Sequence, residues 1–364
     1  MNAKILLPEI KEFLQIIYAS GYSSYYLLNS AQINRIVTDA PLQTIVQLYH
    51  QVLQTSSWPD GITVVFWQIP IEVYSYNNSS LLDFCRKFVF TREAVLWDWK
   101  KEEIIDYFNG LDDDRRKLIR TREEPEKAFA AHPSAILKSV YLSGLYGYEL
   151  SEKLIEAAGK QAHYLKLLKT NDIRDYLVKI LLLAKPGRYL KILQEIGVFS
   201  LFLPELEKAF SVWITPEHNL GEHSIYIADY LPQDINLRLA GLFHDLSKTE
   251  YEKGELFFSE HENKSAQIAK KILDRLNLFL YLGGQNINHH LILNLIRNHM
   301  FSYEKHYTTK KAVERLISRV GLENIENLLL LREANRKAGS VSKQCCSNYD
   351  TELKHKIKQI IKNY

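Results

Sequence analysis

Hydrophobic and polar residues follow two different periods along this chain. Before about residue 100, short runs rich in β-branched and aromatic residues predict strands. These runs are SSYYLL (23–28), ITVVFW (62–67), IEVYSY (71–76), KFVF (87–90) and AVLWDW (94–99). Residues 1–20 and 41–53 instead have apolar residues at helical spacing, and Pro41 suits a first helical turn. This order of elements predicts a small α+β head with a mixed sheet.

After about residue 101 the apolar period is helical almost throughout. The segment FNGLDDDRRK (108–117) is expected to form a turn, and residues 121–150 to form helices broken at Pro133 and near Gly144–Gly147. The 3.6-residue period continues through 151–209 and through the histidine-rich region after it. We therefore predict a head at 1–110, a helical neck at 111–209, an all-α domain at 210–340 and a tail helix at 341–364.

Composition narrows the class of protein. The chain has 364 residues, of which 46% are hydrophobic and 24% charged, as in a folded protein of two or three domains. A net charge of +3 permits a local basic patch for RNA without arguing for one. The three cysteines form no CxxC pair, which suits a reducing compartment, and the N-terminus resembles an amphipathic helix rather than a signal peptide. No apolar run approaches the roughly 20 residues that span a bilayer, so we expect a cytoplasmic protein without a membrane segment.

Five side chains of the kinds that bind divalent metals occur within one helical region: His223, His244, Asp245, His261 and His299. A metal that cleaves phosphoesters needs a few fixed ligands and open positions for water and substrate. The adjacent pair His244–Asp245 can present an imidazole and a carboxylate to one ion, and His223 lies one helix earlier. The two later histidines could bind a second ion or contact a phosphate. Lys248, one turn after Asp245, could neutralise that phosphate.

The plainer alternative is that these are packed or exposed histidines, which is the commoner situation for a histidine on a helix. The His–Asp pair, however, follows the apolar run LRLAGLF (237–243), which would take both side chains into the core. A buried His–Asp pair needs partners, and a metal ion supplies them. The remaining histidines that we considered are assigned no role: His50, His163, His218, His289, His290 and His306.

Four segments resemble the successive blocks of an HD-domain phosphohydrolase: GEHSIYIADYL (221–231), LAGLFHDLSK (239–248), FSEHENKSAQIAKKIL (258–273) and LILNLIRNHM (291–300). They are most similar to the HD domain of bacterial class II tRNA nucleotidyltransferases, which include CCA-adding enzymes and poly(A) polymerases. The resemblance implies that His223, His244, Asp245 and a late aspartate bind the metal, and that His261 and His299 match two further family histidines.

The late aspartate is replaced in this chain. Within LLLLREANRKAG (328–339), Asn335 stands at its position. An amide oxygen is neutral and is a weaker ligand than a carboxylate. We still expect a bound divalent ion, with Ni, Mn, Co, Fe and Mg left open.

The head lacks the residues that nucleotidyl transfer requires, namely paired carboxylates for Mg²⁺ and a glycine backbone around the triphosphate. Between Tyr22 and Asp60 there is no glycine, and the only other acid in that span is Asp39. Glu72 stands alone in its strand-like run. One carboxylate cannot assemble a two-ion site.

The head and neck nevertheless resemble those of the class II nucleotidyltransferases in segments such as YYLL (25–28), GITVVFWQIPIEVYSY (61–76) and IIDYFNGLDDDRRKLIRT (104–121). The Gly-Gly, Arg-Asp and Asp-x-Asp motifs of that family are deleted or replaced. Val89 stands where a further family aspartate belongs, and His132 and Ala135 stand at the Asp and Arg of the motif that reads the base.

Three functions are compatible with these observations. The first is a metal-dependent HD phosphohydrolase for nucleotides or RNA ends, on a nucleotidyltransferase-like scaffold without catalytic motifs. In it Asp245 orients or deprotonates an activated water, and Lys248 with His261 or His299 stabilises phosphate charge. The second is a non-catalytic module that binds tRNA or other RNA, and the third is an active tRNA nucleotidyltransferase with a rearranged head. The expected partner is a tRNA-like RNA or a nucleotide, and the oligomeric state is left open.

Overall fold

The computed structural model describes residues 6–28, 34–49, 51–53, 61–77, 79–216, 218–250, 261–278, 286–300, 309–338, 353–357 and 359–360. The described chain forms two compact units, residues 1–128 with 148–154 and residues 129–147 with 155–364. The predicted class, an α+β head followed by a mostly helical body, is confirmed. Among the described residues, no helix combines the length and the apolar character needed to cross a bilayer.

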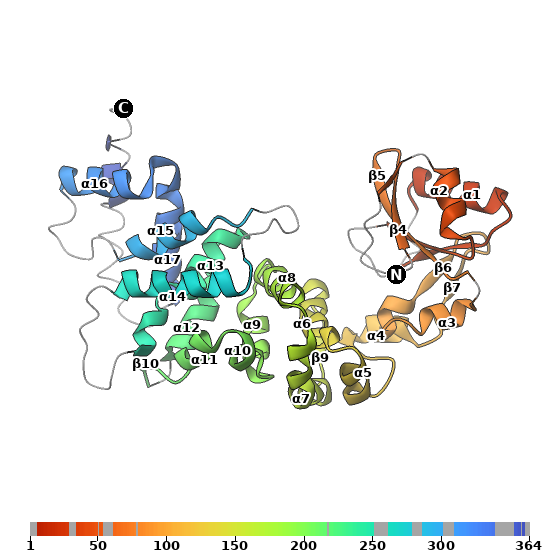
Figure 1. The fold of residues 1–364 in the computed structure, drawn as a ribbon, viewed down its shortest axis with the longest axis horizontal. Coiled ribbons are helices and arrows are strands. Elements are labelled where there is room, and N and C mark those ends of the chain that lie inside the picture. Colours follow the sequence, from red (N-terminus) through yellow and green to blue (C-terminus); the bar gives the residue numbers. More distant parts are fainter. Residues whose placement is uncertain are drawn as a thin grey trace. The chain divides into compact units, whose positions relative to one another are not determined.

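The first unit is built on a seven-stranded mixed sheet with the order β3-β4-β5-β2-β1-β6-β7. Strands β2 and β5 pair in parallel, and the other neighbours in this sheet are antiparallel (Figure 1). The elements are α1 (Pro8–Ala19), β1 (Ser24–Leu27), β2 (Asn34–Thr38), α2 (Leu42–Leu48), β3 (Val52–Leu53), β4 (Gly61–Phe66), β5 (Ile69–Ser75), α3 (Leu81–Cys85), η1 (Thr91–Ala94), β6 (Leu96–Asp98), β7 (Glu103–Ile105), α4 (Gly110–Arg116), β8 (Leu118–Ile119) and β9 (Glu149–Leu150), while α5 (Pro125–Ala131) starts here.

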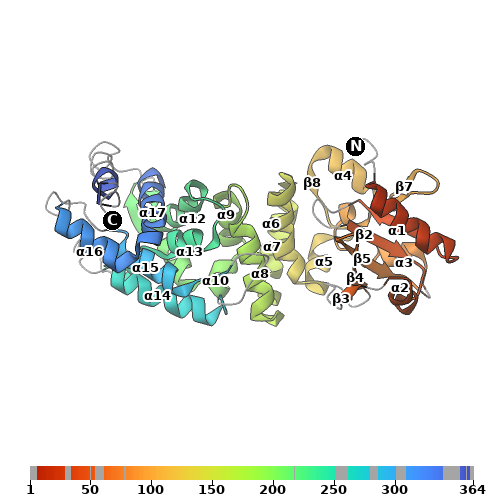
Figure 2. The same ribbon diagram turned by 90° about the horizontal axis from the view of Figure 1, so that it is seen from above.

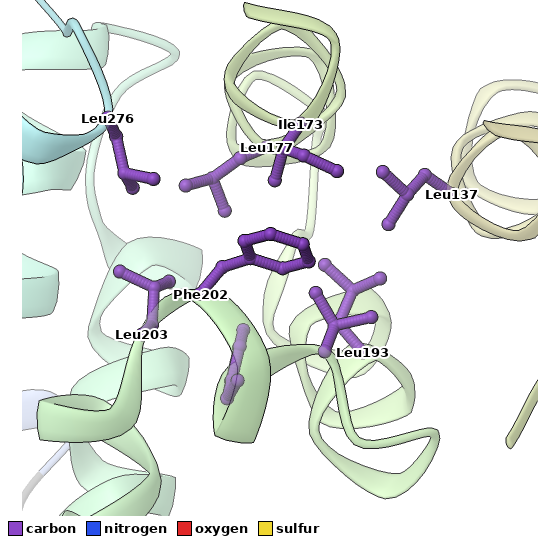
Figure 3. A pocket seen from close by; sticks show the side chains of 9 residues that line it. Leu137, Ile173, Leu177, Leu193, Phe202, Leu203 and Leu276 are labelled. Atoms are coloured by element: carbon purple, nitrogen blue, oxygen red, sulfur yellow. The ribbon is translucent and has the colours of Figure 1, made fainter. Parts of the chain in front are cut away.

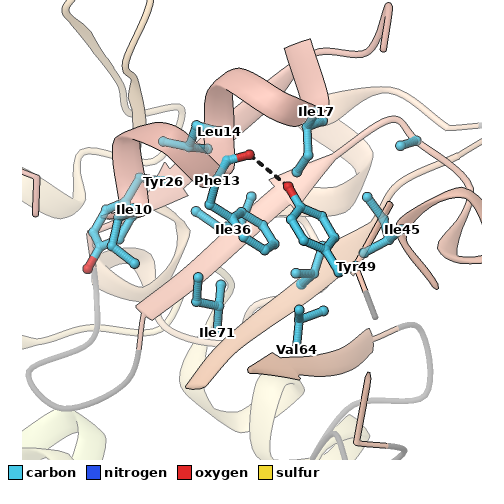
Figure 4. Close-up of a cluster of buried hydrophobic side chains, with 12 residues drawn as sticks. Ile10, Phe13, Leu14, Ile17, Tyr26, Ile36, Ile45, Tyr49, Val64 and Ile71 are labelled. Atoms are coloured by element: carbon cyan, nitrogen blue, oxygen red, sulfur yellow. Dashed lines mark hydrogen bonds between the residues drawn. The ribbon is translucent and has the colours of Figure 1, made fainter. Parts of the chain in front are cut away.

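The core of the head lies between the sheet and the first two helices (Figure 4). Helix α1 buries residues at positions i, i+3, i+4 and i+7, which places its apolar stripe on the sheet. Tyr49, just after α2, stacks on Phe13 with ring centroids 4.1 Å apart. Its hydroxyl donates to the Phe13 carbonyl oxygen at 2.8 Å. Within the segment 1–20, the residues Pro8–Ala19 thus form a helix that covers one face of the sheet.

Several local expectations for the head differ from the structure. Residues KFVF (87–90) form no strand, and Phe90 makes only an isolated bridge to Thr121, because this aromatic run packs side chains such as Phe88 against Phe84. Strand β2 was missed, although it is central in the sheet. The expected helix over 41–53 ends at Leu48.

The expected turn at 108–117 is also wrong, because it contains the helix α4. The carboxylate of Asp106 accepts from the backbone N–H groups of Gly110 and Leu111 at 2.9 Å each, which caps the helix start. A Cβ at Gly110 would lie 2.5 Å from the carbonyl oxygen of Thr91. Glycine therefore lets α4 approach η1 closely, a tertiary requirement that a turn-like composition conceals.

The second unit is almost entirely helical. The predicted helix breaks at Pro133 and in the region of Gly144–Gly147 are confirmed, with a helix from Ser134 to Tyr146 that includes Gly144 and ends before Gly147. Its elements are α6 (Ser134–Tyr146), α7 (Glu152–Gln161), η2 (Ala162–Leu167), α8 (Thr170–Leu181), α9 (Gly187–Glu195), α10 (Val198–Phe202), α11 (Pro204–Ala209), β10 (Trp213–Thr215), β11 (His218–Asn219), α12 (Leu220–Tyr226), η3 (Ile227–Tyr230), α13 (Ile235–Phe243), η4 (Leu246–Glu250), α14 (His261–Arg275), α15 (His289–Asn298), α16 (Lys310–Val320), η6 (Leu322–Asn324) and α17 (Ile325–Ala338). The division into neck, all-α domain and tail stays a prediction.

Helix α13 is the central element of the region after residue 210. All nine of its residues are buried, and it packs against α12, α14, α15 and α17 (Figure 2). Arg238 is fully buried there, and its guanidinium donates to the carbonyl oxygens of Leu181, Leu183 and Leu231. These bonds satisfy a charge that would otherwise be costly to bury. They fix α13, and with it the His–Asp pair at its C-terminal end.

A small void between α6, α8, α9 and α10 is lined only by apolar side chains, among them Leu137, Leu177, Leu193 and Phe202 (Figure 3). It offers no donor, acceptor or charge to a ligand. It is a packing gap.

Candidate metal centre

The first two histidines of the centre lie where helices end. His244 follows α13 and His299 follows α15. The Nδ1 of His244 lies 2.7 Å from the carbonyl oxygen of Gly241, and the Nδ1 of His299 lies 2.7 Å from that of Ile296. The last carbonyls of a helix lack intrahelical partners, so these contacts place the proton on Nδ1. Each ring then presents the lone pair of Nε2, which is the form that binds a metal.

The other two histidines are fixed by different contacts. His223 is buried on α12, and its ring hydrogen-bonds the backbone of Ala338 at the end of α17. His261 is the first residue of α14. Its carbonyl oxygen accepts from the Ser247 hydroxyl at 2.9 Å, and the Ser265 hydroxyl donates to that of Ser247 at 3.0 Å. Four separate helices thus contribute one imidazole each.

The carboxylate of Asp245 lies at the centre of the group. Its Oδ2 is 3.1 Å from His244 Nε2, and its Oδ1 is 3.3 Å from His261 Nε2 and 3.4 Å from His299 Nε2. Within each of two sets, His223–His244–Asp245 and Asp245–His261–His299, the possible ligand atoms all lie within 4.8 Å of one another. The structure therefore brings together all five residues singled out from the sequence, in two sets that share Asp245.

Electrostatics favour the protonation states that a metal requires. Burial lowers the pKa of His223 and that of His299 to about 4, so both rings are neutral near pH 7. Burial alone would raise the pKa of Asp245, but the nearby His244 and Lys248 hold that pKa well below its usual value. The neutral rings of His223 and His299 and the ionised carboxylate of Asp245 are donors suited to a divalent transition metal.

A test of fit comes from the buried polar atoms. His223 Nδ1, His244 Nε2, Asp245 Oδ1 and His299 Nε2 are all buried and have no hydrogen-bond partner in the described protein. Each such atom costs about 1–3 kcal/mol when left unsatisfied. A cation bound within either set would satisfy nitrogen lone pairs and the shared carboxylate together. The residues present thus fit a divalent metal ion.

Lys248 and Asn335 complete the set of residues expected from the sequence. The ammonium of Lys248 lies 2.6 Å from Asp245 Oδ2, so it is paired with the carboxylate. Asn335 is half-buried on α17, one turn before Ala338, whose backbone bonds the His223 ring. The role of Asn335 as a ligand stays a prediction.

Two residues near the centre were missed by sequence reasoning. Arg332 is fully buried on α17, and its guanidinium donates to the His299 carbonyl oxygen at 2.9 Å. His218 lies on β11 with its ring centroid 5.9 Å from that of His223, and its buried Nε2 has no hydrogen-bond partner. A charged residue within the apolar run of 325–334 was the only signal for Arg332, and for His218 the spacing of five residues before His223 was the only one.

The head differs from this region. Its Glu72, on β5, lies opposite Arg35 on the parallel strand β2. Arg35 Nε donates to Glu72 Oε2 at 2.7 Å, and the Tyr74 hydroxyl donates to the same oxygen at 2.5 Å. Among the residues that the structure describes, the sets that could bind a metal ion both lie in the region after residue 210.

Two models of known protein families match parts of the chain. The model of the HD domain matches residues 219–336, and the model described as the probable RNA and SrmB-binding site of polymerase A matches residues 147–210. The CC-adding tRNA nucleotidyltransferase of Thermus thermophilus is 26% identical over 262 residues, 67% of this chain and 57% of that protein. The chain is thus similar to tRNA nucleotidyltransferases and contains a match to the HD domain. A multifunctional CCA protein of Nitrosomonas europaea is 23% identical over 57% of this chain and 52% of its own length. The matched part of the chain thus spans little more than half the length of these relatives.

Solved structures show the same fold. The CCA-adding enzyme of Bacillus stearothermophilus in complex with CTP superposes with a TM-score of 0.66 at 18% identity, covering 97% of this chain and 83% of that one. The Thermotoga maritima CCA-adding enzyme complexed with tRNA gives a TM-score of 0.59 at 14% identity, covering 96% and 84%. At these identities the likeness concerns the fold alone. It confirms the predicted architecture of a mixed-sheet head and a helical body.

Proposed function

We propose that the region 210–340 is a metal-dependent phosphohydrolase acting on nucleotides or on RNA ends, with His223, His244 and Asp245 as the metal ligands. The observation that carries this proposal is the convergence of buried, unpartnered ring nitrogens on one ionised carboxylate. A divalent ion bound there supplies an activated water and polarises a phosphoryl oxygen. Ni, Mn, Co, Fe and Mg are all candidates.

Residues of the chain would orient the attacking water, accept its proton and contact the phosphate. Asp245 faces His261 and His299 through one oxygen and Lys248 through the other, so it can orient a water and accept its proton. His261 is placed to donate to a phosphoryl oxygen, whereas the neutral His299, whose proton lies on Nδ1, presents the lone pair of Nε2. Lys248 keeps Asp245 ionised and lies one turn away, where its ammonium can move to an incoming phosphate. Asn335 would serve as a weak fourth ligand.

The decisive experiment measures metal and activity together. Wild-type protein, His244→Ala and the control His290→Ala, an exposed histidine on α15, are purified and analysed for bound metal. Each is assayed on bis(p-nitrophenyl) phosphate with added Ni²⁺, Mn²⁺ or Mg²⁺. Joint loss of metal and activity in His244→Ala alone supports the proposal. Equal metal content and rate in all three proteins would refute it.

A second candidate is a non-catalytic module that binds tRNA or another RNA. The match of 147–210 to an RNA-binding region of polymerase A supports it, as does the neutral Asn335 in the place of a carboxylate. It requires salt-dependent tRNA binding that is unaffected by chelators and by His244→Ala. Retained tRNA binding in a protein without metal or hydrolytic activity would favour this module over the enzyme.

Nucleotide addition is the function that the head's residues support least. Glu72 is already paired with Arg35, and a guanidinium cannot replace the two ions that bind a triphosphate. The relatives are named for adding CC or CCA to tRNA, so the activity must be tested directly. Incorporation of labelled ATP or CTP into tRNA would restore this function, and its absence would exclude it.

A further inference from the structure

The hairpin formed by β10 and β11 lies next to the candidate metal centre and has no part in it so far. Its register pairs Thr215 with His218 across the two strands. The backbone N–H of Leu220 donates to the Val212 carbonyl oxygen at 2.7 Å and closes the hairpin. Asn219 then caps α12, because its side chain accepts from the Glu222 N–H at 2.8 Å. The hairpin is therefore directly continuous with the helix that contains His223, with no intervening loop residue.

Two buried polar atoms on this hairpin lack partners. His218 Nε2 and Thr215 Oγ1 are both inaccessible to solvent and neither has a hydrogen-bond partner in the described protein. Directly paired residues on neighbouring antiparallel strands share a face, with Cβ atoms about 5 Å apart. The two atoms can therefore serve one ligand. A buried donor pair without an acceptor is the arrangement that an oxyanion fills.

His218 also extends a row of imidazoles. Ring centroids are 5.9 Å apart for His218 and His223, 5.3 Å for His223 and His244, and 4.9 Å for His244 and His299. Yet His218 belongs to neither set of residues whose ligand atoms lie close enough to share an ion. It is adjacent to the centre without being positioned as a ligand. It can therefore reach the part of a substrate that projects beyond the metal.

We propose that His218 and Thr215 form a phosphate-contacting subsite of this centre, in which His218 Nε2–H and the Thr215 hydroxyl donate to phosphoryl oxygens that the metal does not bind. The inference rests on the proposed function for the presence of a phosphorylated substrate. It adds the hairpin as the element that positions the phosphate relative to His223. His218 is then a substrate-contacting residue and not a metal ligand.

The test measures phosphate binding and metal content separately. Inorganic phosphate is titrated calorimetrically into full-length protein, both as purified and after loading with Mn²⁺, for wild type, His218→Ala, His218→Gln and Thr215→Val. The exposed His290→Ala serves as the matched control. Bound metal is determined by elemental analysis for each protein. Because Gln retains an N–H donor and Val retains the shape of Thr, these two variants separate a lost contact from a lost fold.

We expect His218→Ala to weaken phosphate binding roughly tenfold, with unchanged metal content, as lost charge-assisted hydrogen bonds typically do. His218→Gln and Thr215→Val should weaken it less, and His290→Ala not at all. Unchanged phosphate affinity in His218→Ala, or no phosphate binding by wild type, would overturn the inference. So would loss of metal in His218→Ala, because it would make His218 a ligand or a support for one.

The outcome is distinguishable from failure of the proposed function. If the wild type hydrolyses no phosphodiester but still binds phosphate through His218, the subsite stands and the hydrolase does not. If substitution of His244 abolishes hydrolysis and metal binding while substitution of His218 leaves phosphate affinity unchanged, the proposed hydrolase is supported and the subsite is refuted.

Discussion

Glu72 in the head and Asp245 in the region after residue 210 are both buried carboxylates, and their surroundings differ. In the head, one oxygen of Glu72 accepts from both Arg35 and Tyr74, at 2.7 Å and 2.5 Å. In the second region, Asp245 pairs one oxygen with Lys248, while its Oδ1 has no hydrogen-bond partner and faces two imidazole nitrogens. The protein itself supplies a cation to Glu72. Asp245 retains an oxygen that can bind a cation from outside.

The comparison teaches that a buried acid alone does not mark a metal site. What matters is whether its neighbours are fixed cations or neutral donors. Arg35 prevents a metal ion from binding next to Glu72, because its guanidinium occupies the space and supplies the charge that an ion would supply. The ring nitrogens of His244 and His299 next to Asp245 have no hydrogen-bond partners among the described residues, so they remain available to a metal ion.

The largest expected effect comes from removing the central carboxylate. Asp245→Ala should reduce metal affinity by at least about 100-fold, since even loss of an outer contact to a ligand costs about 10–100-fold. The exposed Asp274→Ala on α14 is the control. Metal content by elemental analysis after dialysis measures the effect. Full metal content in Asp245→Ala would remove the contrast between the two regions.

The next largest effect concerns the pair formed by Arg35 and Glu72 in the head. Arg35→Ala leaves a buried carboxylate without its cation, and we expect a loss of about 2 kcal/mol in unfolding free energy, since the pair is partly exposed to solvent. Urea denaturation followed by circular dichroism measures it. The double variant with Glu72→Gln should recover most of the loss. Without that recovery, Arg35 would stabilise the head by packing and not by its charge.

A smaller effect concerns Asn335 at the candidate metal centre. Asn335→Asp should raise metal affinity roughly tenfold, because a carboxylate replaces a neutral amide as a ligand. Competition with a chelating indicator measures the dissociation constant. The control is Asn327→Asp, near the start of the same helix. If the two variants behave alike, Asn335 is not a ligand.

The smallest effect concerns the second donor to Glu72. Tyr74→Phe removes one hydrogen bond and should cost about 1 kcal/mol of unfolding free energy, with metal content unchanged. Denaturation and elemental analysis on the same preparation give both numbers. A change in bound metal would mean that the head also contains a metal site, contrary to the comparison.

Much of the centre was predictable because its signals are local in the sequence. An HD pair at the end of an apolar run, and histidines at matching places on other helices, were sufficient to select the five residues that the structure brings together. The helix breaks at Pro133 and Gly147 were equally local, since a proline and a glycine with positive φ act on their own backbone.

The remaining features were not predictable, because they depend on which surfaces meet. Strand β2 was missed, since NRIVT is short and its partners lie at 24–26 and 71–75. Helix α4 depends on Asp106 as a cap and on Gly110 against the backbone of Thr91. His218 had no distinguishing sequence context, and only its distance to His223 shows its position.

The sequence by itself determined the types of element, the apolar faces that must be buried and the side chains able to bind a metal, because periodicity and chemical type belong to each residue. Only the tertiary structure decided which charges meet. It placed Arg35 beside Glu72 through a parallel pairing of two strands, and it left Asp245 among imidazoles from four helices. Pair energies depend steeply on separation and on burial, and both are properties of the packed fold.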